Sequence, residues 1–161
     1  MSKIKFGAIY KDILTGFEGM AIERYKYITG CDTIRLKPED DTKEAKNFTA
    51  EMLKFVDDGA SKRLKLQNKG NSMEDIDKAI YDFGDKCEDK ITGFKGKVVS
   101  MNIAITGDIS YCISPKYSKK NTNNDGQWFD EGRLVLKNKS KDKIKTDKER
   151  VGGEVPKMKL R

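Results

Sequence analysis

A repeat with a fixed offset constrains this chain more than any other feature. Residues 6–19 read F-G-A-I-Y-K-D-I-L-T-G-F-E-G, and residues 83–96 read F-G-D-K-C-E-D-K-I-T-G-F-K-G, 77 positions further on. The same frame continues without a gap to Pro38 and Pro115. Many of the shared residues are glycine or proline, which backbone geometry usually selects rather than side-chain chemistry. The sequence therefore predicts two copies of one structural unit.

Each copy has the pattern of a small β unit. Apolar residues fall on one face at period two from Ile4 to Tyr10, as in a half-buried strand. The T-G-F-E-G sequence that follows predicts a tight loop whose glycines permit positive φ or close backbone approach. Further strands are expected at 20–28 and 31–36 in the first copy, and at 83–88, 97–105 and 109–114 in the second.

The copies differ in length after the prolines. We match R-L-K-L at 63–66 with R-L-V-L at 133–136 as the strand that closes each unit. This gives a first unit over residues 1–66 and a second over 81–136. In the first unit, three- and four-residue spacing of Ala45, Phe48, Met52 and Phe55 predicts a helical insert over 41–55.

The remaining segments connect or extend the two units. Residues 67–80 are expected to form a linker with a short helix, because Ser72 and Asp75 suit a helix start before an apolar face. The stretch 117–127 is polar and rich in asparagine and lysine, which predicts a loop. Residues 137–161 have no periodicity and are expected to form a basic, flexible tail. The predicted fold class is mainly β with one or two short helices.

The charge is distributed unevenly along the chain. The formal net charge is +7, but the two units are close to neutral and the excess lies in the tail. A uniformly basic groove is therefore not predicted for either unit. The tail could hold nucleic acid through phosphate contacts or serve only as a solubilising end, and the sequence leaves both readings open.

Several classes of site are disfavoured by residue usage. Histidine is absent, which removes the commonest general base and the commonest metal ligand. Cys31, Cys87 and Cys112 occupy positions that do not match between the copies and lack metal-binding spacing. We read them as reduced thiols and expect no cofactor and no catalytic activity. No apolar run reaches the length of about 18 residues that spans a membrane, and no signal peptide is evident.

The opening of the second copy resembles a known kind of small barrel. Its F-G-D-K-C-E-D-K-I-T-G-F-K-G-K-V-V sequence resembles the KOW-type start of SH3-like barrels, in which a glycine turn leads into the second strand. This resemblance implies two tandem SH3-like barrels that pack as a pseudo-dimer. Barrels of this kind often bind RNA, ribosomal surfaces or protein tails.

A second resemblance is to small phage-encoded proteins of unassigned function. Their pattern reads D-x-I-T-G-F-x-G, then Y-x-x-G-C, then P, then W-F-D-E-x-R-L. The first copy supplies 12–19, 27–31 and Pro38, and the second supplies 89–96, Pro115 and an intact 128–134. Neither copy keeps the whole pattern. This resemblance implies a phage or prophage accessory protein in the host cytoplasm and implies no reaction.

Aromatic and arginine residues are the candidate binding residues. Phe17 and Phe94 could stack on a ligand, although a core-filling role at the end of each barrel is favoured. Neighbouring residues on a strand face opposite ways, so either Trp128 or Phe129 should face solvent or a partner. The adjacent carboxylates Asp130 and Glu131 are expected to cap a turn or to pair with an arginine. The candidate set is Trp128, Phe129, Arg133, Phe94, Phe17, Arg24, Tyr25 and Tyr27.

Two functions follow from this set. The first is a non-enzymatic binding protein that acts in host takeover or counter-defence by binding a host or viral protein, RNA or DNA. The alternative is a sponge that sequesters a nucleotide immune messenger of the cyclic or ADP-ribose type. Neither requires a membrane, and the sequence leaves self-association open.

Overall fold

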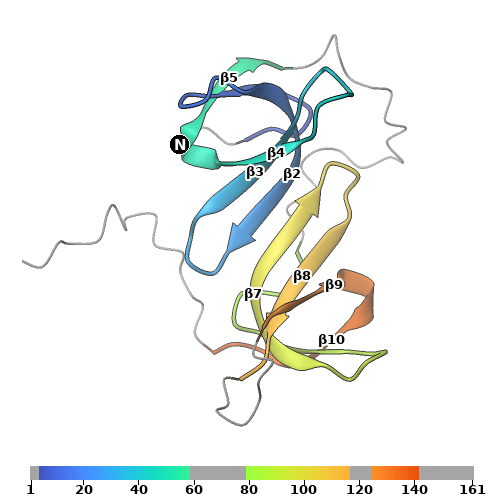
Figure 1. Cartoon of the computed structure of the whole chain (residues 1–161). Coiled ribbons are helices and arrows are strands. Elements are labelled where there is room, and N and C mark those ends of the chain that lie inside the picture. The colour runs from blue at the N-terminus through green and yellow to red at the C-terminus, as the bar shows by residue number, and fades with distance from the viewer. Residues whose placement is uncertain (1–3, 59–78, 117–124, 142–161) are drawn as a thin grey trace, which may run out of the picture.

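The protein is mainly β. The computed structural model describes residues 4–58, 79–116 and 125–141, and Figure 1 shows them as two groups of strands, one above the other. The strands of the first unit are β1 (Ile9–Asp12), β2 (Glu18–Tyr27), β3 (Asp32–Lys37), β4 (Lys46–Thr49) and β5 (Leu53–Asp57). Those of the second unit are β6 (Lys86–Asp89), β7 (Lys95–Ala104), β8 (Ile109–Ser114), β9 (Gln127–Asp130) and β10 (Leu134–Asn138).

The two units have the same topology. Neighbouring strands follow the order β5-β1-β2-β3-β4 in the first unit and β10-β6-β7-β8-β9 in the second, all antiparallel. A 3-10 turn precedes the last strand of each unit, η1 (Ala50–Met52) and η3 (Glu131–Arg133). Among the described strands, the first and last in each order do not pair, so each unit's sheet is open. The repeat is thus a structural repeat.

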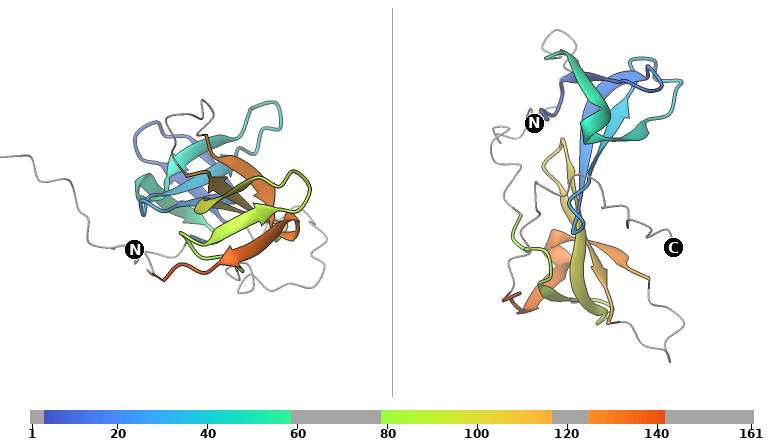
Figure 2. Two further views of the ribbon diagram at one scale, coloured as in Figure 1. Left: turned by 90° about the horizontal axis from the view of Figure 1, so that it is seen from below. Right: turned by 90° about the vertical axis from the view of Figure 1, so that its left-hand side faces the viewer.

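The two units share one ten-stranded sheet through the pairing of β2 with β7. Tyr25 lies opposite Asn102, and these two residues occupy the same position in the two copies. The contact therefore has local two-fold pseudo-symmetry. The right-hand view of Figure 2 shows the long strands joining the two units at a narrow waist.

Two hydrogen bonds confirm this symmetry at the ends of the pairing. The Ile28 N–H donates to the Val99 carbonyl (2.9 Å), and the Ile105 N–H donates to the Ile22 carbonyl (2.8 Å). Ile105 is the repeat equivalent of Ile28, and Val99 is the equivalent of Ile22. The predicted pseudo-dimeric arrangement of the copies therefore has a defined backbone register.

Each unit has its own hydrophobic core. The core of the first unit is small and contains Ala8, Tyr10, Ala21, Ile34 and Leu36. The core of the second unit is larger and contains Tyr81, Cys87, Val98, Met101, Ile103, Tyr111, Ile113, Phe129 and Leu134. Phe6 of the first unit packs against the core of the second. The units therefore share side-chain packing as well as backbone hydrogen bonds.

The shared glycines explain why the repeat is so visible in the sequence. Gly16 and Gly93 have φ of 72° and 71° in the loop between the first two strands of each unit. Gly19 and Gly96 have a different role. A Cβ at Gly19 would lie 2.6 Å from the Lys37 carbonyl oxygen, and one at Gly96 would lie 2.5 Å from that of Ser114. Only glycine allows the neighbouring strand to approach this closely.

The helix predicted over 41–55 is wrong. This segment contains β4, the 3-10 turn η1 and the first part of β5. Phe48, Ala50 and Leu53 pack against the core from these three elements. Their spacing imitates a helical period because a tight turn separates two short strands, and the core contacts override the local pattern.

The prediction of the closing strand also needs correction. β5 pairs with β1 as β10 pairs with β6, so Leu53, and not Leu64, is the equivalent of Leu134. The offset between the copies grows from 77 to 81 residues in the loop before β4 and stays constant from there. Residues 63–66 lie outside the described residues.

Other predicted segments fall wholly or partly outside the described residues. They include the linker and its helix up to residue 78, the loop 117–124 and the tail from 142 onward. The tail prediction began two residues too early, because Lys137 and Asn138 belong to β10. Within the part of the chain that the structure describes, no helix is long and apolar enough to cross a membrane.

Candidate binding surface

The joined units form one continuous outer face. Directly opposite residues in an antiparallel sheet point to the same side, and β4, β3, β2, β7, β8 and β9 lie next to one another in that order. We call the side facing away from the two cores the composite face. Its central residues are Glu23, Tyr25, Tyr27 and Arg35 from the first unit, and Ser100, Asn102, Ser110, Cys112, Trp128 and Asp130 from the second.

An aromatic pair spans the junction between the units on this face. The rings of Tyr25 on β2 and Trp128 on β9 meet edge to face, with centroids 6.1 Å apart and planes at 84°. Two strands, β7 and β8, lie between β2 and β9, so the side chains reach toward each other over smaller residues. Trp128 remains 46% exposed, whereas its neighbour Phe129 is 6% exposed and belongs to the core. The expected alternation of these two residues is confirmed.

A charged pair fixes the position of Tyr25. Its hydroxyl donates to Glu23 Oε2 (2.6 Å), and Arg35 Nη1 lies 3.5 Å from the same oxygen. Burial and the hydrogen bond to Glu23 raise the pKa of Tyr25. The phenol therefore remains a neutral donor at neutral pH, and the ring is held in place toward Trp128.

Asn102 contributes an unsatisfied acceptor to the composite face. Its Oδ1 atom is buried and has no hydrogen-bond partner in the described structure. Asn102 lies opposite Tyr25 on one side and opposite Ser110 on the other. An unpaired buried acceptor costs about 1–3 kcal/mol. The structure places it next to the aromatic pair.

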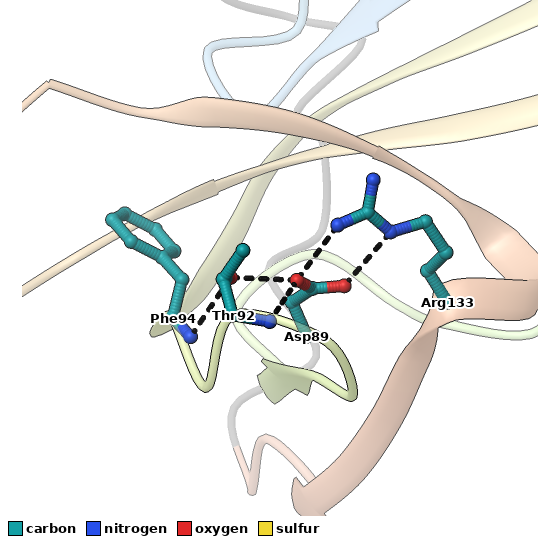
Figure 3. Close-up of polar contacts among 4 residues, drawn as sticks. All are labelled: Asp89, Thr92, Phe94 and Arg133. Carbon is teal, nitrogen blue, oxygen red and sulfur yellow. Dashed lines mark hydrogen bonds and ion pairs between the residues drawn. The ribbon is translucent and has the colours of Figure 1, made fainter.

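Phe94, Phe129 and Arg133 form a structural cluster, as Figure 3 shows in part. Arg133 donates from Nε to Asp89 Oδ1 (3.0 Å) and from Nη2 to Asp89 Oδ2 (2.8 Å). Its guanidinium lies 5.3 Å from the centroid of Phe129, which contacts Phe94 at 5.6 Å. These contacts tie the 3-10 turn η3 to the end of β6 and the loop after it. The three side chains therefore pack against one another and have a structural role.

Asp89 is the centre of that cluster. It is fully buried, and it also accepts hydrogen bonds from the Thr92 N–H (2.8 Å) and hydroxyl (2.6 Å). The hydrogen bonds from Arg133 hold the pKa of the Asp89 carboxyl far below its usual range. The first unit keeps the equivalent bonds between Thr15 and Asp12, but Met52 occupies the position of Arg133. The arginine is therefore specific to the second unit.

The remaining candidates in the first unit are dispersed. Phe17 packs on Phe48 (5.1 Å between ring centroids), with the Lys46 ammonium 5.5 Å from its ring. Arg24 forms an ion pair with Asp32 on the core side of β2. Tyr27 lies on the composite face opposite Ser100. The structure thus brings together only Tyr25, Tyr27 and Trp128 of the predicted set on one exposed surface.

The adjacent carboxylates form no close ion pair with Arg133, although the charge of Asp130 adds to the Asp89 hydrogen bond in raising the pKa of that arginine. Asp130 accepts a hydrogen bond from the Ser110 hydroxyl (3.3 Å) and makes no side-chain bond to the turn. Glu131 accepts from the hydroxyl of Tyr111 (2.8 Å), and burial raises the pKa of that tyrosine. The pairing expected from sequence proximity is wrong because Asp89 reaches Arg133 from another strand.

The cysteines are not arranged as a reactive or metal-binding group. Cys31 is exposed, whereas Cys87 and Cys112 are buried, and all three are free thiols. Burial raises the pKa of Cys87 to about 11, which keeps this thiol protonated at neutral pH. Within the described ranges, no three side chains of the metal-binding types gather into a site.

Sequence reasoning missed Asn102, Glu23 and Arg35. No local motif marks these residues, since their proximity to Tyr25 depends on the register of β2 with β3 and β7. Comparison of the chain with protein-family models, with curated proteins and with solved structures gave no match.

Proposed function

We propose that the chain is a non-enzymatic binding protein that contacts a host or viral macromolecule through the composite face. The two units are proposed to be SH3-like barrels. The strand order β5-β1-β2-β3-β4 and the 3-10 turn before the last strand support this assignment. The resemblance of 89–96 and 128–134 to phage accessory proteins supports a role in host takeover or counter-defence.

The Tyr25–Trp128 contact carries this proposal. One ring comes from each unit, so the surface exists only when the two copies are joined. Tyrosine and tryptophan are the residue types that most often dominate binding energy at protein interfaces. Trp128 is the only tryptophan in the chain and is nearly half exposed at this position. A composite aromatic site also gives a reason for keeping two copies in one chain.

The proposal is tested by recovering the partner with and without the aromatic pair. The tagged chain is purified from bacterial cells, and the bound protein and nucleic acid are identified by mass spectrometry and sequencing. Tyr25→Ala and Trp128→Ala should each reduce recovery of the specific partner at least about tenfold, the loss of about 1.4 kcal/mol expected for a hot-spot residue. Asn47→Ala is the matched control for the aromatic pair itself, because Asn47 is the equivalent of Trp128 in the first unit and lies on the outer strand β4 of the same face.

The control defines the outcome that would end the proposal. All three variants must keep the wild-type circular dichroism spectrum. Equal recovery of the partner by wild type, Tyr25→Ala and Trp128→Ala would exclude the composite face as the contact. Equal loss in Asn47→Ala would show that binding does not depend specifically on the aromatic pair.

The exposed ring of Trp128 beside Tyr25 favours the nucleotide sponge as a second candidate. A planar base could stack on this ring. A ligand that binds only the native state raises stability by mass action. Cyclic nucleotides and ADP-ribose should then raise the melting temperature and change Trp128 fluorescence. An unchanged melting temperature across such a panel would reject this candidate.

A further inference from the structure

A row of donor side chains crosses four strands of the second unit. Asn138 of β10 lies opposite Lys86 of β6, Lys86 lies opposite Lys97 of β7, and Lys97 lies opposite Ser114 of β8. Because opposite residues point to the same side, these four side chains share one surface. Lys86, Lys97 and Asn138 are exposed. The row contains hydrogen-bond donors and no carboxylate, and we call it the donor row.

The two lysines at its centre are uncompensated. Like charges directly opposite each other destabilise a sheet. Neither Lys86 nor Lys97 has an ion-pair partner among the residues that the structure describes. The first unit has Ile9 opposite Met20 at the equivalent place. The second unit therefore carries an unfavourable charge pair where its sister copy has an apolar one.

The carboxylate of Glu88, beside the donor row on β6, is already occupied. Glu88 lies 3.5 Å from the ammonium of Lys95 and 3.0 Å from that of Lys137. These two interactions lower the pKa of the Glu88 carboxyl, which therefore remains charged. Glu88 cannot also neutralise Lys86 and Lys97, and the surface keeps a positive excess.

The start of the basic tail is fixed next to the donor row. The backbone N–H of Ser140 donates to Oδ1 of the buried Asp85 (2.7 Å), the residue directly before Lys86. Lys139 and Lys141 flank Ser140 and are both exposed. This hydrogen bond brings Lys139 and Lys141 close to the start of β6, where Lys86 lies.

We propose that the donor row, together with Lys137, Lys139 and Lys141, binds the phosphate backbone of a nucleic acid. This surface lies on β6, β7, β8 and β10. Lys97 and Ser114 share the side of the sheet that carries the composite face, but the row does not include Tyr25 or Trp128, so the inference goes beyond the aromatic pair. Protein contacts to phosphate and sugar come from lysine, serine and asparagine side chains alike. The donor row contains all three types.

An anionic lipid surface shares the phosphate chemistry but fits less well. Lipid binding by a basic cluster is diffuse and needs lysines and arginines alone, often with inserted apolar residues. The donor row instead has a neutral donor at each end, Asn138 and Ser114. Neighbouring strands are about 4.8 Å apart, so the row is a linear track of donors, which suits a linear chain of phosphates.

The test compares two lysine pairs in the full chain. Lys86→Gln with Lys97→Gln removes the pair in the donor row. Lys11→Gln with Lys54→Gln is the matched control, since these lysines also lie opposite each other, on β1 and β5. The control row also contains Glu18 opposite Lys11, which offsets part of its positive charge. Binding is measured by fluorescence anisotropy, with labelled single-stranded RNA of about 20 nucleotides and duplex DNA of about 20 base pairs, at several salt concentrations. Each phosphate contact with a duplex releases about 0.9 counterions, so the slope of log affinity against log salt reports the number of contacts.

The donor-row variant should bind roughly tenfold more weakly at low salt, and its plot of log affinity against log salt should be shallower by about 2. The control variant should match wild type. Equal weakening in both variants, unchanged binding in the donor-row variant, or binding only to anionic phosphatidylserine vesicles would each overturn the proposal. Tyr25→Ala should leave the salt slope unchanged, which separates this result from failure of the composite face.

Discussion

Tyr25 of β2 lies directly opposite Asn102 of β7, and each is the other's equivalent in the repeat. A strand that pairs with its own copy about a central residue is the geometry of an isologous dimer. Here the geometry occurs within one chain, so the two equivalent positions could acquire different residues. One is an aromatic ring that meets Trp128, and the other is an amide with an unsatisfied oxygen. This asymmetry gives the composite face its chemistry.

Replacing Asn102 should reveal a stability cost at this site. Asn102→Val removes a buried acceptor without a partner and introduces a residue that favours strands. We expect the free energy of unfolding to rise by about 1 kcal/mol, as measured by urea denaturation. The matched change is Asn47→Val on the exposed surface of β4, which should change stability by less than about 0.5 kcal/mol. A loss of stability in Asn102→Val would show that the amide is satisfied in solution.

Arg133→Met should destabilise the second unit. The substitution copies Met52 of the first unit and leaves the fully buried Asp89 without its bidentate partner. Removing one member of such a pair leaves an uncompensated charge. The midpoint of urea denaturation should fall clearly. Met52→Leu, at the equivalent position, should leave it nearly unchanged, and equal midpoints for both variants would contradict the assigned role of Asp89.

The same pair predicts a dependence of stability on pH. The Arg133 hydrogen bonds lower the folded-state pKa of Asp89 below its ordinary value of 3.8. A group with a lowered pKa contributes stability above its unfolded pKa and loses it as pH falls. The wild type should therefore lose stability as pH falls from about 5 through 4 and below. Arg133→Met should show a weaker decrease over this window, measured as urea midpoints at successive pH values.

Gly96→Ala should be poorly tolerated despite the small size of the change. The new Cβ would lie 2.5 Å from the Ser114 carbonyl oxygen and 2.6 Å from its carbon, so β7 and β8 would have to separate. We expect a loss of about 1–3 kcal/mol or more. Gly132→Ala is the control, because nothing lies within 4 Å of a Cβ there. Thermal denaturation of the two variants gives the comparison.

Lys97→Glu should stabilise the protein. It replaces a like-charge cross-strand pair with an opposite-charge pair facing Lys86. The expected gain is about 0.2–1 kcal/mol at low salt, decreasing as salt is added. Salt-dependent thermal denaturation provides the measurement. No gain at low salt would mean that another charged group already neutralises Lys86.

The sequence predicted those parts of the fold that depend on local constraints. Gly16, Gly19 and their equivalents mark loops and close strand contacts, and the alternation from Ile4 to Tyr10 marks a strand, so two β units could be inferred. The helix prediction for 41–55 was wrong, because Phe48 and Leu53 contact the core from two strands separated by a turn and not from one face of a helix.

The site was predictable only in part for a related reason. Trp128 and Tyr25 are recognisable by residue type, but their contact depends on the register of strands more than 70 residues apart in sequence. Asn102 and the donor row carry no motif at all. Lys86 and Lys97 become neighbours only through the pairing of β6 with β7, and Ser140 approaches Asp85 only because β10 returns to β6.

The β2–β7 pairing also leaves neither long strand with an exposed edge at the junction. Residues 23–27 of β2 and 100–104 of β7 would be exposed edges if each unit stood alone. Unpaired edge strands are templates for association with other chains. Joining the copies covers both edges at once, and each copy does this for the other. Expressing one unit alone would expose the edge of its longest strand over these residues, where it could pair with other chains.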